Sequence, residues 1–242
     1  MTGASRGIGA AVARGAALRG YAVAVNYSSD EEGAKNVVRA IEAAGGKALA
    51  VLADVADEAA VVRLFESATR ELGPVRALVN NAGVSGTLGR FEAIAADEIA
   101  RVLAINVLGT MLCAREAVRR MSTRRSGTGG AIVNLSSRAA QLGGAGEWLH
   151  YAASKGAVET FTLGLAREVA SEGIRVNAVS PGLIETGLHA AAGDAERIER
   201  LKTAIPQGRA GTAAEVAAAV LWLLSPEASY VNGSILAVSG GR

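Results

Sequence analysis

Short apolar segments alternate with longer segments of helical periodicity along the whole chain. The apolar runs predict strands at 22–27, 47–53, 77–79, 131–135, 174–179 and 234–238. Apolar residues at every third or fourth position predict helices at 8–19, 31–44, 57–72, 97–121, 151–169 and 213–224. Strands that are apolar throughout are typical of a sheet covered on both faces. The pattern therefore predicts an α/β protein with a doubly wound parallel sheet flanked by helices.

No internal repeat, linker or domain boundary interrupts this alternation, so residues 1–242 are expected to form a single domain. Asp57 is a candidate helix cap, and Gly73-Pro74 is expected to end the helix that follows it. Residues 122–130 are polar and glycine-rich and predict a loop. The stretch 183–211 has a mixed pattern with some helix.

Composition excludes several classes of protein. Half of the residues are hydrophobic, which is enough for a large core, and the formal net charge of +2 is mild. No Lys/Arg cluster occurs beyond Arg124-Arg125, which argues against nucleic-acid binding. A single cysteine, Cys113, and two histidines leave no basis for a disulfide or a metal site. No apolar run reaches the roughly 18 residues of a membrane helix, and no signal peptide opens the chain, so a cytoplasmic location is expected.

Tyr151 and Lys155 stand four residues apart in the predicted helix at 151–169. This spacing places both side chains on one face, about one turn apart. A phenol ordinarily has a pKa of about 10, and a nearby ammonium lowers that pKa because it favours the phenolate. The pair is therefore a candidate acid/base with its own charge partner. Taken alone, the same spacing also occurs by chance on helix surfaces.

A glycine-rich turn, Gly3-Ala4-Ser5-Arg6-Gly7-Ile8-Gly9, precedes the first predicted helix. Glycines let backbone amides approach a phosphate, and the following helix N-terminus favours the anion. The first five residues also match the Gly-x-Ser-x-Gly nucleophile elbow of hydrolases. A hydrolase of that kind needs a later acid and a later histidine, and neither His150 nor His189 lies in the last fifth of the chain. Phosphate binding is the favoured interpretation.

These features occur together with others in a fixed order. The full set is Thr2-Gly3-x-x-x-Gly7-x-Gly9, Asn80-Asn81-Ala82-Gly83, Asn106, Ser137, Tyr151-x-x-x-Lys155 and Pro181-Gly182. On these motifs the chain resembles the short-chain dehydrogenase/reductase family over essentially its whole length. Taken as a whole, the sequence is similar to those of the β-ketoacyl-carrier-protein reductases. The resemblance implies one NAD(P)-binding domain of the Rossmann type that interconverts a ketone and a secondary alcohol.

The resemblance also implies catalytic roles. Tyr151 is expected to donate a proton to the carbonyl oxygen, and Ser137 to hold that oxygen. Lys155 is expected to bind the nicotinamide ribose and to lower the pKa of Tyr151. Asn106 is expected to hold a water that links Lys155 to solvent. Ser137 precedes Tyr151 by fourteen residues, one more than in many relatives, so Ser136 is the alternative.

The cofactor site implied by the resemblance is formed by several separate segments. Its expected members are Gly3, Ser5, Arg6, Gly7, Ile8, Gly9, Asn26, Ser28, Asp54, Asn80, Ala82, Gly83, Tyr151, Lys155, Pro181, Gly182, Ile184 and Thr186. Among them, Asp54 is expected to bind the adenine, and the segment 80–83 to brace the sheet beside the adenosine. Pro181, Gly182 and Thr186 are expected on the nicotinamide side. No metal is expected.

The choice of cofactor depends on the residues at the end of the predicted strand at 22–27, which would be the second strand if another precedes the glycine turn. An acidic residue there would bind the ribose 2′-hydroxyl of NAD and repel a 2′-phosphate. This chain has Asn26-Tyr27-Ser28-Ser29, with no acid before Asp30. Arg6 supplies a cation suited to a phosphate. NADP(H) is therefore favoured and NAD is the alternative.

The sequence leaves the substrate open. A small carbonyl or alcohol compound is expected, possibly a 3-oxoacyl compound, with a sugar or polyol dehydrogenase, or a non-catalytic NADP-binding regulator, as alternatives. Trp148, Leu188 and His189 are candidates for either the substrate mouth or lid packing, and His150 is expected to face outward. The apolar stripes near 97–121 and 151–169 are core or subunit interface, and the resemblance implies a homotetramer or homodimer.

The first strand of a sheet of this kind should precede the glycine turn. Such a strand needs about five or six residues, yet only Met1 and Thr2 stand before Gly3. We therefore expect a truncated first strand in this sequence, and hypothesise that the native chain begins several residues upstream with an apolar strand.

Overall fold

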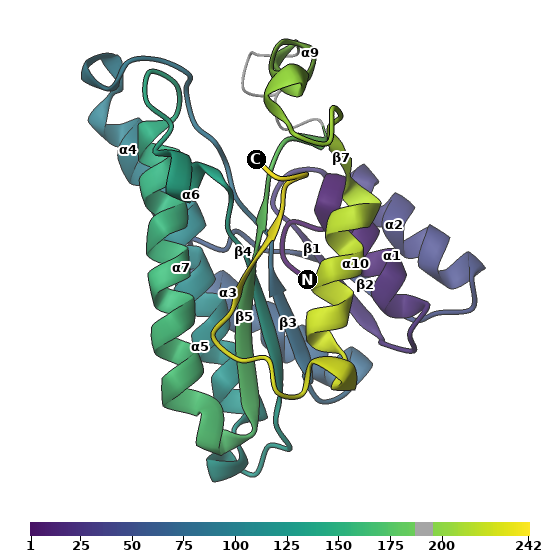
Figure 1. Ribbon diagram of the computed structural model, residues 1–242. Helices are drawn as coiled ribbons and strands as arrows, with labels where there is room; N and C mark the ends of the chain where they lie inside the picture. Colours follow the sequence, from purple (N-terminus) through teal and green to yellow (C-terminus); the bar gives the residue numbers. More distant parts are fainter. Residues whose placement is uncertain (187–195) are drawn as a thin grey trace.

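Parallel strands form the centre of the molecule, and helices cover both of their faces (Figure 1). The structure is a computed structural model and describes residues 1–186 and 196–242. Its strands are β1 (Val23–Tyr27), β2 (Ala48–Leu52), β3 (Ala77–Asn80), β4 (Gly130–Leu135), β5 (Ile174–Pro181), β6 (Ile184–Glu185), β7 (Gly211–Thr212) and β8 (Ile235–Val238). Its helices are α1 (Gly7–Ala17), α2 (Glu31–Ala43), α3 (Glu58–Leu72), α4 (Ala96–Leu103), α5 (Gly109–Met121), α6 (Ala139–Leu142), α7 (Leu149–Val169), α9 (Arg197–Leu201) and α10 (Ala213–Leu224).

The central strands are hydrogen-bonded in two groups. One has the order β1-β2 and the other β3-β4-β5-β8, and every pairing in them is parallel. Met1 and Thr2 lie between the two groups and are bonded to both. The Thr2 amide donates to the Val79 carbonyl at 3.0 Å, and the Met1 carbonyl accepts from the Asn26 amide at 3.1 Å. The predicted doubly wound α/β arrangement is confirmed, with two residues of chain bridging β1 and β3.

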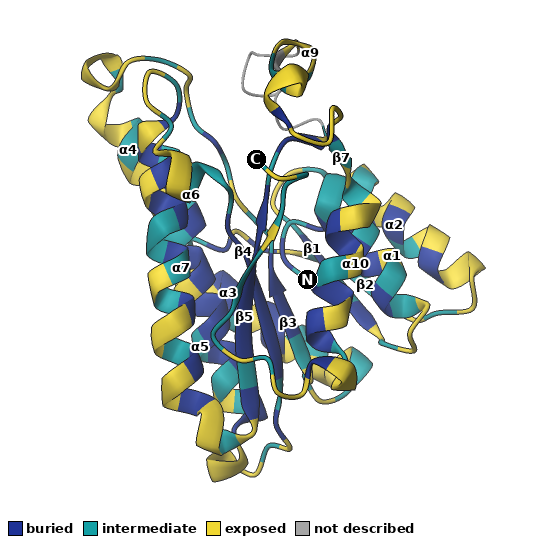
Figure 2. Ribbon diagram, in the orientation of Figure 1, coloured by how far each residue is buried: buried dark blue, intermediate teal, exposed yellow. Residues whose placement is uncertain are grey.

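Two hydrophobic clusters hold the layers together. Helices α1, α2 and α10 pack on one face of the strands, and α1 and α10 lie against each other. Helices α3, α5 and α7 pack on the other face. Burial follows this layering, since the inner sides of the helices and almost all of β4 and β5 are buried (Figure 2). The all-apolar strands of the sequence are explained by this two-sided cover.

Local signals set most helix boundaries. The Asp57 carboxylate accepts from the amides of Ala59 and Ala60 at 2.8 and 3.2 Å, as its predicted capping role requires. The helix predicted at 97–121 is interrupted: α4 ends at Leu103, a π-helical turn covers Ala104–Leu108, and α5 then begins. A π-turn inside a helix often marks a functional site. No helix among the described residues is long and apolar enough to cross a membrane.

Candidate active site

A cavity of about 560 Å³ opens at the carboxyl ends of the strands. The segments that follow β1, β2, β3, β4 and β5 all contribute to its wall, together with the glycine turn and the start of α7. Ligands of doubly wound sheets bind at this edge. The predicted site residues that line the cavity are Gly3, Ser5, Arg6, Gly7, Ile8, Asn26, Ser28, Asp54, Ala82, Gly83, Ser137, Tyr151, Lys155, Pro181, Gly182, Ile184 and Thr186. Gly9, Asn80 and Asn106 do not line it.

The glycine turn is held in a conformation that needs glycine. Gly3 and Gly7 have φ values of +57° and +56°. A Cβ on Gly9 would lie 2.3 Å from the Gly3 carbonyl oxygen, so a larger residue would open the turn. Helix α1 begins at Gly7, and neither an acidic residue in its first turn nor a side-chain cap occupies its N-terminus. Its first amides therefore form a natural anion site at the cavity wall.

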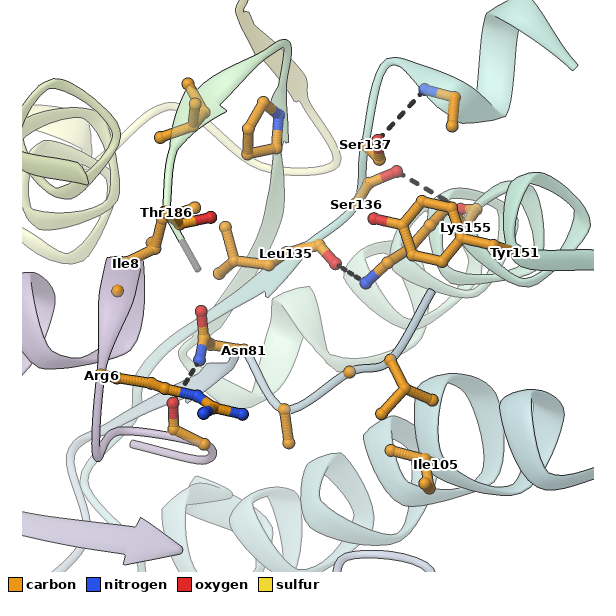
Figure 3. A pocket seen from close by; sticks show the side chains of 18 of the residues that line it. Arg6, Ile8, Asn81, Ile105, Leu135, Ser136, Ser137, Tyr151, Lys155 and Thr186 are labelled. Atoms are coloured by element: carbon orange, nitrogen blue, oxygen red, sulfur yellow. Dashed lines mark hydrogen bonds between the residues drawn. The ribbon is translucent and has the colours of Figure 1, made fainter. Parts of the chain in front are cut away.

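Polar side chains behind the turn hold it in place. The Thr2 hydroxyl accepts from the amides of Asn81 and Ala82 at 2.9 and 3.0 Å. The Asn81 carboxamide donates to the carbonyl oxygens of Thr2 and Gly3 (Figure 3). The sequence gave Thr2 no role beyond membership in a motif and gave Asn81 only a share in the bracing segment 80–83, because the partners of both residues are about eighty residues away along the chain.

Two residues predicted to bind the cofactor, Asn26 and Asn80, also have hydrogen-bond partners within the protein. The buried Asn26 carboxamide accepts from the Gly3 amide at 3.2 Å and donates to the Ala53 carbonyl at 2.9 Å. It therefore ties the turn to the end of β2, although it also lines the cavity. Asn80 is buried and donates to the Asn134 side chain at 2.9 Å. That bond joins β3 to β4, in keeping with the bracing expected of segment 80–83.

Tyr151 and Lys155 both reach the cavity from α7 (Figure 3). The Lys155 ammonium donates to the Leu135 carbonyl at 2.7 Å and lies 5.6 Å from the centre of the Tyr151 ring. Burial lowers the pKa of Lys155 to about 8. Burial also raises the pKa of Tyr151, and a hydrogen bond with Ser137 partly opposes that rise. The Tyr151 pKa is therefore raised overall, against the expectation of a lowered value, because burial of the phenol dominates.

The two candidate serines have different surroundings. Ser136 is buried, and its hydroxyl donates to the Glu159 carboxylate at 2.7 Å. Ser137 is partly exposed and shares a hydrogen bond with the Tyr151 side chain. A substrate oxygen that contacts Tyr151 is therefore within reach of Ser137, while Ser136 anchors the end of β4 to α7.

Asn106 lies in the π-turn and is completely buried. Its carboxamide accepts from the Val84 amide at 2.8 Å and donates to the Val84 carbonyl and the Ser154 hydroxyl, each at 2.9 Å. A Cβ on Gly83 would lie 3.2 Å from the Asn106 oxygen and 3.4 Å from the Lys155 nitrogen. The two side chains thus approach the same backbone, and the structure places Asn106 where it orients the Val84 segment and α7.

His150 was expected to face outward, and this expectation is wrong. Its side chain is buried, and its Nε2 atom has no hydrogen-bond partner among the described residues. A Cβ on Gly86 would lie 2.4 Å from that nitrogen, so the loop after β3 covers the ring. Trp148 lines the cavity and its indole nitrogen donates to the Gly86 carbonyl at 3.2 Å. The expectations for Leu188 and His189 concern positions outside the described residues.

Fold and site together are those of a dinucleotide-binding oxidoreductase. Residues 3–242 match the family model described as enoyl-(acyl carrier protein) reductase. The chain is 51% identical to the uncharacterized oxidoreductase YgfF of Escherichia coli, over 100% of this chain and 98% of the relative. It is 42% identical to 3beta-hydroxysteroid dehydrogenase 1 of Eggerthella lenta (100% and 91% covered) and 39% identical to a 3-oxoacyl-[acyl-carrier-protein] reductase of Staphylococcus aureus (100% and 96%).

Solved structures agree with these relatives. A short-chain type dehydrogenase/reductase from Mycobacterium marinum superposes with a TM-score of 0.93 at 34% identity, covering 100% of this chain and 93% of the other. A short chain dehydrogenase from Burkholderia cenocepacia, solved in complex with NADP, gives 0.91 at 35% identity, with 99% and 95% covered. The chain belongs to the short-chain dehydrogenase/reductase family and is an oxidoreductase.

Proposed function

We propose that this protein is an NADPH-dependent carbonyl reductase that interconverts a ketone and a secondary alcohol, with Tyr151 as the acid/base. The observation that carries the proposal is the meeting of Ser137, Tyr151 and Lys155 on one wall of the cavity whose other wall is the glycine turn. A binding protein without catalysis has no need of a partly buried tyrosine beside a serine hydroxyl in that place.

The residues present fit an NADP-type cofactor. The uncapped first turn of α1 and the close-packed glycines suit the pyrophosphate. The first acid after β1, Asp30, accepts from the Gly33 amide at 3.0 Å as the cap of α2, so its charge is already engaged. The exposed Arg6 lines the same cavity and supplies a cation for a 2′-phosphate. When bound, the nicotinamide supplies the hydride that the reaction needs.

Each catalytic side chain then has a defined task. Tyr151 is protonated at neutral pH, since the ordinary pKa of a phenol is about 10 and burial raises the Tyr151 pKa further, so it can donate a proton to a carbonyl oxygen. Ser137 holds the same oxygen through its hydroxyl. Lys155 carries a buried positive charge beside the ring and stabilises the phenolate that forms. Asn106 fixes the backbone of Val84, which lines the cavity next to these groups.

The substrate class is a ketone, with a 3-oxoacyl compound as the first candidate because one relative bears that name. A ketosteroid is the second candidate, because another relative is named as a 3beta-hydroxysteroid dehydrogenase. In the oxidative direction, a sugar or polyol is the alternative substrate. We further propose that the protein is a homotetramer or homodimer. The cytoplasmic location expected from the sequence stays a prediction.

The decisive experiment compares the protein with its Tyr151→Phe variant, which lacks only the phenolic hydroxyl. NADPH consumption is followed by absorbance with a panel of a 3-oxoacyl thioester, a diketone and a ketosteroid. Oxidation of a sugar with NADP is followed in the same way. We expect turnover of at least one ketone and a loss of about 10²-fold or more in kcat for Tyr151→Phe, the scale of lost acid catalysis.

NADPH binding, measured by fluorescence titration, should be nearly the same in both proteins. Undiminished turnover in Tyr151→Phe would remove this residue from the mechanism. Tight NADPH binding with no turnover of any compound in the panel would favour the regulator instead.

A further inference from the structure

The Glu159 carboxylate of α7 binds both the residue before Ser137 and the short helix after it. One of its oxygens accepts from the Ser136 hydroxyl at 2.7 Å, and the other accepts from the Gln141 side-chain amide at 2.5 Å. Ser136 follows the end of β4, and Gln141 is in α6. The carboxylate therefore joins α7 to the chain on both sides of Ser137.

The orientation of the Gln141 amide is set by a second partner. Its oxygen accepts from the Arg138 guanidinium at 3.0 Å, and the same guanidinium donates to the Arg242 carbonyl at 2.8 Å. A side-chain amide whose oxygen is bound by a cation presents its NH₂ group to other partners. That group meets the carboxylate of Glu159, so a cation, an amide and an anion follow one another across α6.

Helix α6 has little apolar contact to hold it in place. None of its four residues is buried, and its backbone amides donate to carbonyls of the adjacent residues 137–139. The chain just before α6 is better anchored, since the amides of Ser136 and Arg138 donate to carbonyls of β5 at 2.8 and 2.9 Å. Short helices with few buried apolar contacts open at low cost. The bond from Gln141 to Glu159 is therefore a main attachment of α6 to α7.

The position of α6 in turn controls the Ser137 hydroxyl. The Ala139 amide, at the start of α6, donates to the Ser137 Oγ atom at 3.1 Å. The same hydroxyl shares a hydrogen bond with the Tyr151 side chain, and the two residues lie on one wall of the cavity (Figure 3). Because the amide occupies one lone pair of Oγ, it restricts rotation of the hydroxyl. A displaced α6 would release that restriction.

We propose that Glu159 is a positioning residue, which fixes segment 136–142 on α7 and so holds the Ser137 hydroxyl in the geometry that the reaction needs. Glu159 follows Lys155 by one helical turn and Tyr151 by two, so one face of α7 carries all three side chains. It does not line the cavity and acts through Ser137. The inference rests on the role proposed for Ser137. Misplacing a group that contacts the reacting atoms by about 1 Å can cost as much as about 10²-fold in rate.

The test is a double-mutant cycle between Glu159 and Ser137. With a ketone that the protein reduces, we expect Glu159→Ala to lower kcat about tenfold and to leave NADPH affinity unchanged. In the Ser137→Ala background the same change should cost less than about twofold, because the hydroxyl that Glu159 positions is then absent. Glu168→Ala is the matched control, since Glu168 is on the same helix, is exposed and does not line the cavity.

A second variant removes the other end of the attachment. Gln141 is exposed, so Gln141→Ala leaves the core intact even if Glu159→Ala folds poorly. We expect a several-fold fall in kcat for Gln141→Ala. In both variants the backbone amides of residues 140–143 should exchange with solvent several-fold faster than in the unmodified protein, since α6 opens more often.

Equal losses of kcat in the two backgrounds would overturn the proposal, because Glu159 would then act independently of Ser137. Undiminished kcat in Glu159→Ala, or unchanged exchange at residues 140–143, would overturn it as well. Failure of the proposed function gives a different result, namely full turnover in Tyr151→Phe or no turnover of any ketone. In that case the exchange at residues 140–143 still decides whether Glu159 fixes the segment.

Discussion

The protonation of two neighbouring side chains, Tyr151 and Lys155, is controlled by burial more than by their mutual charge. The Tyr151 pKa is raised and the Lys155 pKa is lowered to about 8, so in both cases burial favours the neutral form of the side chain over the charged form. A neutral phenol suits reduction, where the tyrosine gives up a proton. Oxidation of an alcohol needs the phenolate, so this direction should become faster as the pH rises.

The lowered Lys155 pKa predicts a pH-dependent stability. Between pH 8 and the ordinary lysine value of 10.5, the unfolded chain binds a proton at this residue that the folded protein has released. The free energy of unfolding should therefore rise with pH in this window through Lys155. In Lys155→Met this contribution is absent. Urea unfolding of both proteins at pH 7, 8, 9 and 10 measures the difference, and parallel stability curves would contradict the assignment.

Arg6 permits a sharp test of cofactor choice. Its side chain is exposed at the cavity wall beside the uncapped end of α1. Arg6→Ala should weaken NADPH binding about tenfold or more and leave NADH binding nearly unchanged, because only NADPH carries the 2′-phosphate. Arg14→Ala is the matched control, since Arg14 is on the same helix, is exposed and does not line the cavity. Equal losses for both cofactors would contradict the prediction.

At the scale of elements, the loop after β3 is attached to three helices beside the substrate side of the cavity. Val84 is bonded to Asn106 in the π-turn, and the Thr87 amide donates to Glu98 of α4 at 2.9 Å. The Trp148 indole donates to the Gly86 carbonyl just before α7 begins. Because Tyr151 is in the first turn of α7, the loop and the catalytic helix are coupled through this contact.

Trp148→Phe keeps most of the ring and removes the donor to Gly86. We expect a several-fold increase in KM for the ketone, with kcat less affected and NADPH affinity unchanged, since the loop wall loosens on the substrate side alone. Trp222→Phe on α10 is the control, because Trp222 is half exposed and does not line the cavity. If Trp148→Phe changed only the melting temperature, the loop would have no part in substrate binding.

At the scale of the whole molecule, apolar side chains remain exposed on the outer side of the α5 and α7 layer. Met111 and Leu163 are 37% and 39% exposed, and Leu108 next to α5 is 46% exposed. Several exposed apolar residues on packed helices often mark a protein–protein interface. This surface is the most direct support for a homo-oligomer.

Placing charges on this layer should separate the subunits. We expect sedimentation equilibrium to give a dimer or tetramer for the unmodified protein and a monomer for the double variant Met111→Glu, Leu163→Glu, because burying two unpaired carboxylates is costly. Leu18→Glu is the control, since Leu18 is 75% exposed at the end of α1 in the opposite layer. A monomeric unmodified protein, or an unchanged assembly in the double variant, would exclude this interface.

The sequence by itself determined the features that depend on neighbours along the chain. The periodicity of apolar residues predicted the alternation of strands and helices. The position of Asp57 predicted that it caps α3, and the glycine spacing predicted the turn before α1. The helical spacing of Tyr151 and Lys155 was enough to place both on one face of α7. In each case the controlling interaction spans only a few residues, so a linear pattern contains the information.

Only the tertiary structure decided what depends on distant partners. Burial reversed the expected direction of the Tyr151 pKa, and the loop after β3 enclosed His150, because desolvation depends on what packs over a group. The Asn26 carboxamide joins the glycine turn to the residue after β2, and a π-helical turn that contains Asn106 interrupts a helix that periodicity predicted as continuous. The sequence predicted a truncated first strand, and the structure shows its two remaining residues, Met1 and Thr2, hydrogen-bonded to Asn26 of β1 and Val79 of β3. Such contacts form between segments tens of residues apart, where no local pattern can specify them.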